Sequence, residues 1–172
     1  GGVDGFGAYE FNGTANRNIL VNSLSFVQRP VENMTVSLWI NKNQQTSNQA
    51  IWATNNGGAG PMFHVTDGTS ITFWADVNAD AQSWNSIPNL TGNWRHLVLT
   101  YSNRSVNSTS SNHTAELYVN GATQGIRNFS YLEVYVINAG TFQIGAWAAS
   151  RYFNGTIDDL VVYNRTLTAA QI

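Results

Sequence analysis

The sequence contains no cysteine, which excludes disulfide bonds, thiolate zinc sites and cysteine nucleophiles. Charged residues make up 10% of its 172 residues, well below the usual quarter, and the net charge is −2. So weak a charge gives no basic surface for nucleic acid or for an anionic membrane. Lysine occurs once, at Lys42, and no apolar run approaches the roughly 20 residues of a membrane span. These absences argue against a disulfide-stabilised protein, a nucleic-acid-binding protein and a membrane-spanning segment.

The residues that are present indicate one folded domain. Hydrophobic residues reach 42% and aromatic residues 12%, too many for a disordered chain. The length suits a single domain with its own core, over residues 1–172, and we expect this domain to be a module of a longer chain. Asparagine, threonine, serine and glutamine take the place of the missing charges, so the predicted surface is polar but uncharged.

Short segments of alternating polarity predict an all-β fold, because no helical period lasts beyond a turn or two. Leu97 to Leu99 form a continuous apolar run, typical of a strand buried on both faces. Asn120-Gly121 is a preferred two-residue hairpin turn. The polar stretch 102–113 is predicted to be an exposed loop, and Asn55 to Gly58 a turn. The alternating segments are 36–40, 71–74, 115–119 and 132–136.

Five segments resemble, in order, motifs of the laminin-G-like, concanavalin A-like jelly-roll family. The strongest is F-N-G-T-I-D-D-L-V-V-Y-N-R-T-L-T at 153–168. The resemblance implies a concanavalin A-like jelly roll, in which two antiparallel sheets pack face to face as a sandwich. The other four motifs are A-Y-E-F-N-G at 8–13, M-T-V-S-L-W-I at 34–40, N-W-R-H-L-V-L-T-Y at 93–101 and E-L-Y-V-N-G at 116–121.

Asn-x-Ser/Thr triplets, the acceptor pattern for N-glycosylation, occur nine times and none has proline in the middle. An asparagine- and threonine-rich β surface produces some of them by composition alone. Their excess favours an N-glycosylated protein that is extracellular or on the cell surface. The nine asparagines are Asn12, Asn33, Asn89, Asn103, Asn107, Asn112, Asn128, Asn154 and Asn164.

Asp158 is a candidate metal ligand. In a regular strand it shares a face with Leu160 and Val162, which places a carboxylate on an apolar face. Such a group must be neutralised, hydrogen-bonded or metal-bound. One interpretation is a carboxylate that accepts backbone N–H bonds; the other is calcium held with main-chain carbonyls of the glycine-rich N-terminus. The resemblance implies a structural calcium at this aspartate. We expect the Gly13 carbonyl as a further ligand and Asp159 at the surface.

The tryptophans divide into predicted core and predicted surface. Trp39 and Trp94 lie inside strand motifs and are assigned to the core. A solvent-facing aromatic ring beside polar groups suits sugar recognition, because sugar C–H faces stack on the ring. The alternative is that these rings cap the ends of the sandwich. The candidate ligand-binding residues form two groups: Trp74, Asp76, Asn78, Asp80 and Trp84, and Trp147, Arg151 and Tyr152.

Catalysis has little support. Related hydrolases of this fold place paired glutamates on one strand, since retaining glycosidases need two carboxylates about 5 Å apart. That pattern is absent, and Glu116 and Glu133 fall on different predicted strands. His64, His96 and His113 are assigned to packing or surface positions.

The leading hypothesis is therefore a non-catalytic module that binds carbohydrate or mediates adhesion through glycans or cell-surface glycoproteins, with calcium as a structural cofactor. The alternative is a structural subunit or head domain that self-associates in a cell-surface layer or filament. A glycoside hydrolase that uses Glu116 and Glu133 is the third hypothesis.

Overall fold

The protein is described here from a computed structural model. Its described residues are 1–15, 17–21, 33–44, 48–55, 61–75, 81–107, 110–129, 141–147 and 150–172.

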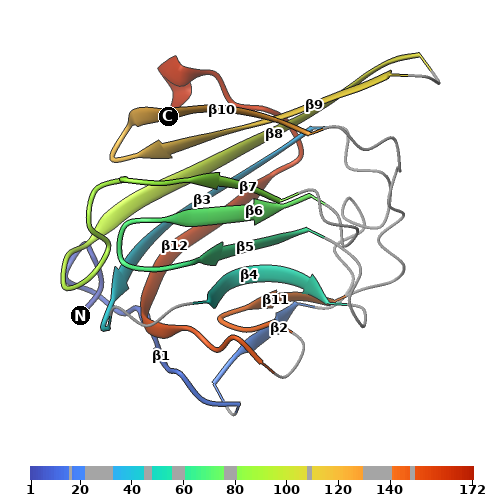
Figure 1. The fold of residues 1–172 in the computed structure, drawn as a ribbon. Coiled ribbons are helices and arrows are strands. Elements are labelled where there is room, and N and C mark those ends of the chain that lie inside the picture. Colours follow the sequence, from blue (N-terminus) through green and yellow to red (C-terminus); the bar gives the residue numbers. More distant parts are fainter. Residues whose placement is uncertain are drawn as a thin grey trace.

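The described strands form two antiparallel six-stranded sheets that lie one over the other (Figure 1). The first sheet has the order β1-β12-β3-β8-β9-β10, and the second has the order β2-β11-β4-β5-β6-β7. This confirms the predicted antiparallel sandwich. Strand bounds in the first sheet are β1 Tyr9–Asn12, β12 Asn154–Tyr163, β3 Asn33–Lys42, β8 Arg95–Asn107, β9 Ser110–Val119 and β10 Ala122–Phe129. Strand bounds in the second sheet are β2 Ile19–Val21, β11 Thr141–Ile144, β4 Gln49–Asn55, β5 Met62–Val65, β6 Ile71–Trp74 and β7 Ala81–Trp84.

The hydrophobic core lies between the two sheets. Alternate residues of β3, β8 and β9 point inward, as the period of two in a strand requires. From the second sheet, Trp52 stacks on Phe142 at 5.4 Å between ring centroids and lies 5.9 Å from Phe63. The inward residues of β3, β8 and β9 include Val36, Leu38, Ile40, Leu97, Leu99, Leu117 and Val119, all buried.

Several sequence predictions are confirmed at the level of elements. The alternating segments 36–40, 71–74 and 115–119 lie in β3, β6 and β9. Asn120 and Gly121 both have positive φ, 51° and 77°, and connect β9 to β10 as a tight hairpin. Residues 97–99 are buried on both faces of the first sheet. Segments 56–60 and 130–140, which contain part of a predicted turn and a predicted strand, lie outside the described residues.

Two predictions are wrong, one about secondary structure and one about the burial of two tryptophans. The polar stretch 102–113 was expected to be a loop, but β8 continues to Asn107 and β9 begins at Ser110, so cross-strand pairing overrides the polar composition. Trp39 and Trp94 are half-buried rather than core residues. Trp39 pairs with His96 on the outer face of the first sheet, and the two rings lie 5.1 Å apart between centroids with a tilt of 32°.

The chain ends in a short 3₁₀ turn, η1 (Ala169–Gln171), after a segment that docks on the first sheet. Leu167 is buried there, and its backbone N–H donates to Thr35 Oγ1 at 3.0 Å. Among the described residues, no helix has the length and hydropathy needed to cross a membrane.

Candidate functional site: the outer face of the second sheet

A second buried cluster lies on the face of the second sheet that points away from the core. Phe63 and Phe73 point inward, so their neighbours Met62 and Trp74 point outward. Ala53 pairs with Met62, which in turn pairs with Trp74 across three adjacent strands. We call the set Ala50, Ala53, Met62, Trp74 and Trp147 the outer-face cluster.

Trp147 reaches this cluster from a turn after β11. Trp147 and Ser150 exchange backbone hydrogen bonds of 3.1 and 2.8 Å, which hold the turn closed. The next residue, Arg151, has a positive φ of 50° and accepts a 2.8 Å bond from the Ala50 N–H at its carbonyl. That bond fastens the turn to β4. The Arg151 Cζ atom then lies 5.2 Å from the Trp147 ring centroid, a cation–π arrangement.

His64 adds a titratable group to the same face. Its side chain is 3% exposed, and its ring centroid is 6.5 Å from that of Trp74. Burial, followed by the positive charge of Arg151, lowers the pKa of His64 to about 4. The imidazole is therefore neutral at pH 7, with one nitrogen as donor and the other as acceptor.

Three polar atoms on this face are buried without a hydrogen-bond partner among the described residues: His64 Nδ1, Trp74 Nε1 and Gln143 Oε1. Gln143 is 5% exposed and pairs with Ala53, which places it in line with the cluster. A buried polar atom that lacks a partner costs about 1–3 kcal/mol. A ligand with hydroxyl groups supplies both donors and acceptors and would satisfy these atoms.

Hydroxyl groups continue the same face toward β7. The hydroxyls of Thr66 and Thr72 lie 2.8 Å apart, and those of Thr72 and Ser83 are also 2.8 Å apart. Thr72 pairs with both His64 and Ser83. The outer face therefore combines two aromatic rings, one guanidinium, a neutral imidazole and a row of hydroxyls.

The structure brings together only part of the predicted ligand-binding set. Trp74, Trp147 and Arg151 meet on the outer face. Tyr152 is half-buried and is not part of the outer-face cluster. The candidate binding residues predicted from the sequence did not include His64 and Gln143. His64, Thr72 and Trp74 occupy outward positions of β5 and β6, and this pattern would have indicated His64 if the pairing of the two strands had been known.

The prediction that Trp84 faces solvent is wrong. Its side chain is 1% exposed and belongs to the main core, because it ends strand β7 on an inward position. Its indole N–H donates to the Gly125 carbonyl at 2.6 Å. The residues expected to join it, Asp76, Asn78 and Asp80, lie outside the described residues.

Asp158 does not lie on the apolar face of its strand. A β-bulge between Asp158 and Val161 shifts the register, and Asp159 within it has a φ of 47°. The bulge leaves Leu160 and Val162 packed on the core, while Asp158 pairs with Trp39 on the outer side. A uniform period of two cannot anticipate such an insertion. Asp159 is exposed, as predicted.

The Asp158 carboxylate accepts backbone hydrogen bonds, which is one of the two interpretations drawn from the sequence. Val3 N–H donates to Oδ2 at 2.9 Å, and Asp159 N–H donates to Oδ1 at 3.0 Å. A Cβ placed on Gly2 would lie 2.3 Å from Asp158 Oδ2, 2.8 Å from the Gly7 carbonyl oxygen and 3.2 Å from Asp4 Oδ1. Oxygen atoms of three residues, two in the N-terminal segment and one in β12, therefore converge beside Gly2, a donor set that suits calcium.

Gly13 does not join this group. It follows β1, where Asn12 pairs with Asn154, whereas Asp158 lies beyond Tyr9 and Ile157 at the other end of the β1–β12 ladder. At about 3.3 Å per residue, the two positions are well over 10 Å apart. Among the described residues, no three His, Asp or Glu side chains cluster as metal ligands, so a calcium site here depends on main-chain carbonyls.

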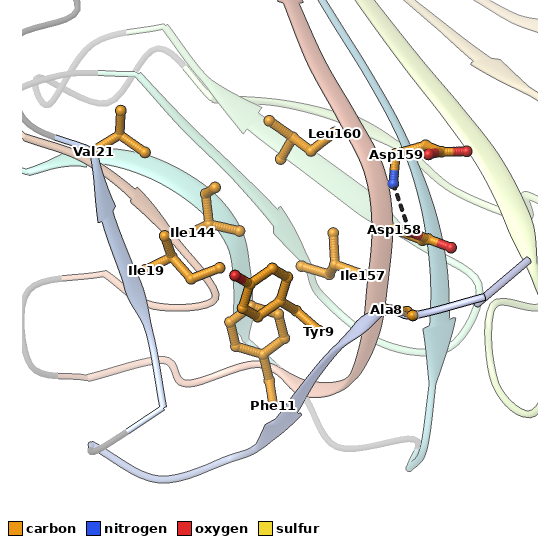
Figure 2. Close-up of a pocket in the computed structure, with 11 residues that line it drawn as sticks. Ala8, Tyr9, Phe11, Ile19, Val21, Ile144, Ile157, Asp158, Asp159 and Leu160 are labelled. Carbon is orange, nitrogen blue, oxygen red and sulfur yellow. Dashed lines mark hydrogen bonds between the residues drawn. The ribbon is translucent and has the colours of Figure 1, made fainter. Parts of the chain in front are cut away.

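A cavity of about 680 Å³ opens beside Asp158, between β1 and β2. Figure 2 shows the lining side chains of Ile19, Ile144 and Ile157 around those of Tyr9 and Phe11, with both aspartates to one side. Tyr9 is 67% exposed. Among the described strands, β1 pairs with β12 alone and β2 with β11 alone, so each has an open edge here.

The predicted glycosylation sites fall mainly on exposed positions. Asn154 is half-buried, and its Oδ1 accepts a 3.1 Å bond from Asn43. Asn103, Asn107 and Asn112 lie on β8 and β9, and their side chains are not among those described. The exposed asparagines are Asn12, Asn33, Asn89, Asn128 and Asn164.

The residues of the hydrolase hypothesis do not form a described pair. Glu116 accepts a hydrogen bond from the Thr123 hydroxyl on the neighbouring strand β10. Glu133 lies outside the described residues. His96 and His113 bond to Ser37 and Tyr101 at 2.8 and 2.7 Å, as packing residues do.

Two antiparallel sheets with this strand order define a lectin-like jelly-roll domain. Residues 12–172 match the family described as the concanavalin A-like lectin/glucanases superfamily, of the laminin G type, and the chain belongs to it. This confirms the resemblance drawn from the five motifs. Comparison with curated protein sequences gives no match.

Solved structures share the fold at low sequence identity. The botulinum neurotoxin type G receptor-binding domain is 16% identical with a TM-score of 0.67; the match covers 97% of this chain but 41% of that domain. Domain 4 of AbnA, an extracellular arabinanase of Geobacillus stearothermophilus in complex with arabinotriose, is 20% identical with a TM-score of 0.65, over 95% and 73% of the two chains. The heptameric SAP-like pentraxin of Limulus polyphemus is 19% identical with a TM-score of 0.68, over 94% and 77%.

Proposed function

We propose that this domain binds carbohydrate without catalysing its turnover, at the outer-face cluster of the second sheet. The observation that carries the proposal is the set of buried polar atoms without partners, at His64, Trp74 and Gln143, beside the half-buried rings of Trp74 and Trp147. Indole rings stack on the C–H faces of sugars, and sugar hydroxyls bond to unpaired donors and acceptors.

The comparisons are consistent with binding. The arabinanase domain was solved with arabinotriose, and the type G toxin domain is a receptor-binding domain. Cell entry of botulinum neurotoxin type C depends on interaction with two ganglioside molecules. Fold likeness alone does not carry function. The proposal therefore depends on the chemistry of the outer face, and the relatives only make glycans the first ligands to test.

We further propose that the domain works outside the cell, partnered by glycans or cell-surface glycoproteins. The five exposed Asn-x-Ser/Thr asparagines support N-glycosylation, and the oxygens around Gly2 and Asp158 support a structural calcium. A bound calcium would fasten the N-terminal segment to β12; the residues to hold it are Asp158, Asp4 and Gly7, in place of Gly13.

A glycan array followed by calorimetry tests carbohydrate binding. We expect Trp147→Ala and Trp74→Ala each to weaken binding at least about fivefold, because a stacked aromatic ring contributes roughly 1–3 kcal/mol to a packed contact. Trp94→Ala removes a half-buried tryptophan that directly precedes β8 of the first sheet and is the matched control, expected to bind as the parent does. Binding that is indifferent to Trp74 and Trp147, or absent for every glycan, contradicts the proposal.

The second candidate function is a subunit of a cell-surface assembly. The open edges of β1 and β2, on either side of an apolar cavity, favour it, because an added strand could pair with such an edge. Light scattering over a concentration series tests this proposal. A higher oligomer that Tyr9→Lys disperses would support it, and a monomer at all concentrations would oppose it.

A further inference from the structure

Arg151 has no counter-ion among the described residues. Its Cζ atom lies over the Trp147 ring, 5.2 Å from the ring centroid, and its charge lowers the pKa of His64. Its backbone carbonyl, rather than its side chain, makes the bond to Ala50. A half-buried arginine normally pairs with a carboxylate or with carbonyl oxygens.

The described carboxylates are engaged or placed elsewhere, and none forms an ion pair with Arg151. Asp158 binds the N-terminal segment, Asp67 accepts from Thr69 in the turn after β5, and Glu116 accepts from Thr123 on β10. The neighbouring His64 supplies no negative charge in either protonation state, and the charge of Arg151 instead helps to lower its pKa. The remaining described carboxylates are Asp4, Glu10 and Asp159.

The position of Arg151 is fixed by the fold. Its backbone lies in the left-handed region, which is costly for a residue other than glycine, and is held there by the Trp147–Ser150 turn and the bond to β4. Its charge therefore stands next to the rings and unpaired polar atoms of the proposed binding face. A guanidinium is weakly hydrated, and its planar fork matches a carboxylate in geometry.

We propose that the sugar recognised on the outer face carries a carboxylate, as sialic and uronic acids do, and that Arg151 is its counter-ion. This inference rests on the proposed carbohydrate-binding function. The guanidinium lies over the Trp147 ring and the sugar ring lies against the cluster, so the carboxylate meets Arg151 while the hydroxyls meet His64, Trp74 and Gln143. Arg151 thus selects acidic glycans over their neutral counterparts.

Matched pairs of probes test the inference: 3′-sialyllactose against lactose, and trigalacturonic acid against its methyl ester. We expect the parent protein to prefer the acidic member of at least one pair by about tenfold or more, as a hydrogen-bonded charge pair provides. Arg151→Gln should abolish the preference, so that the acidic and neutral members of each pair bind with equal affinity. Arg151→Lys should keep part of it. Arg165→Gln, which removes an exposed arginine bonded to Gln171, is the charge-matched control and should keep all of it.

The outcomes separate this inference from the proposed function. Binding of neutral glycans that depends on Trp147 but gains nothing from a carboxylate overturns the inference and leaves the proposed function standing. A preference for sulfated over carboxylated sugars also overturns it. Absence of binding to every probe overturns both. Thermal melting of each variant checks that it is folded. If Arg151→Gln does not fold, the preference of Arg151→Lys for the acidic probes is measured in its place.

Discussion

At the residue scale, the outer face of the second sheet is shaped by the burial of His64. A neutral imidazole is favoured there because charging it would require desolvation close to the Arg151 guanidinium. Trp74 and Trp147 exclude water from the same region, which strengthens each polar interaction a ligand makes there. The residues that would bind a sugar therefore also make the site sensitive to acid.

We expect the protein to lose stability as the pH falls from about 6.5 to about 4. The folded state holds the pKa of His64 near 4, whereas the unfolded chain has the ordinary value near 6.5, so the unfolded chain binds more protons in this interval. The free energy of unfolding is therefore highest above pH 6.5 and decreases as the pH falls to about 4, by an amount on the order of 3 kcal/mol. Urea unfolding at pH 7.0 and pH 4.5 measures the difference.

His64→Gln should remove most of this pH dependence, because glutamine does not titrate. Burial also lowers the pKa of the half-buried His96, partly offset by Asp159, so His96 contributes with the same sign. His96→Gln is the comparison variant and should leave the larger part of the slope in place. An unchanged slope in His64→Gln would contradict the assignment.

At the element scale, strand β12 joins the N-terminal segment to the sandwich. Its bulge turns Asp158 away from the core and toward residues 1–7. That segment folds back on itself, with the Gly2 N–H donating to the Phe6 carbonyl at 2.6 Å and Phe6 N–H donating to Asp4 Oδ1 at 2.8 Å. The Val3–Asp158 bond then anchors it to β12. A local irregularity in one strand thus fixes a segment more than 150 residues away in sequence.

Gly2→Ala should lower the free energy of unfolding by about 1–2 kcal/mol, because the new Cβ would lie 2.3 Å from Asp158 Oδ2 and break the anchoring bond. Gly7→Ala is the matched control, since a Cβ there meets nothing within 4 Å. Chemical denaturation of both variants measures the difference. Equal stabilities would show that the N-terminal segment is not anchored through Asp158.

At the scale of the whole molecule, the two sheets are joined mainly by apolar packing, and a calcium at Asp158 would add a link between the N-terminal segment and β12. The cavity beside that site marks the side of the sandwich where β1 and β2 have open edges. Binding energy gained there stabilises the folded state as a whole, since an ion that binds only the native protein shifts the folding equilibrium.

Calcium should therefore raise the melting temperature in proportion to the logarithm of its concentration, and a chelator should reverse the rise. Asp158→Asn should lose the response. Asp159→Asn, which changes the exposed neighbouring carboxylate, should keep it. Magnesium should have a smaller effect because it is reluctant to give up its water. An equal calcium response in Asp158→Asn would contradict the site, and no response in the parent protein would contradict calcium binding.

The sequence by itself determined the fold class, because alternating side chains, the Asn120-Gly121 turn and the five motifs are local features that each specify strand or turn. It also placed Trp74, Trp147 and Arg151 among the candidate ligand-binding residues, and the structure brings these three together. It could not give the face on which a side chain lies where the period of two is interrupted, as at Asp158. It also could not show that Trp84, predicted to face solvent, ends a strand on an inward position.

The tertiary structure decided what the outer face is made of. Ala50, Met62, Trp74 and Trp147 come from four separate segments, and only strand pairing and the turn at 147–151 bring them together. His64 and Gln143 became part of the candidate site for the same reason, since burial depends on neighbours distant in sequence. Local patterns encode strands, whereas the environment of a side chain is a property of the whole chain.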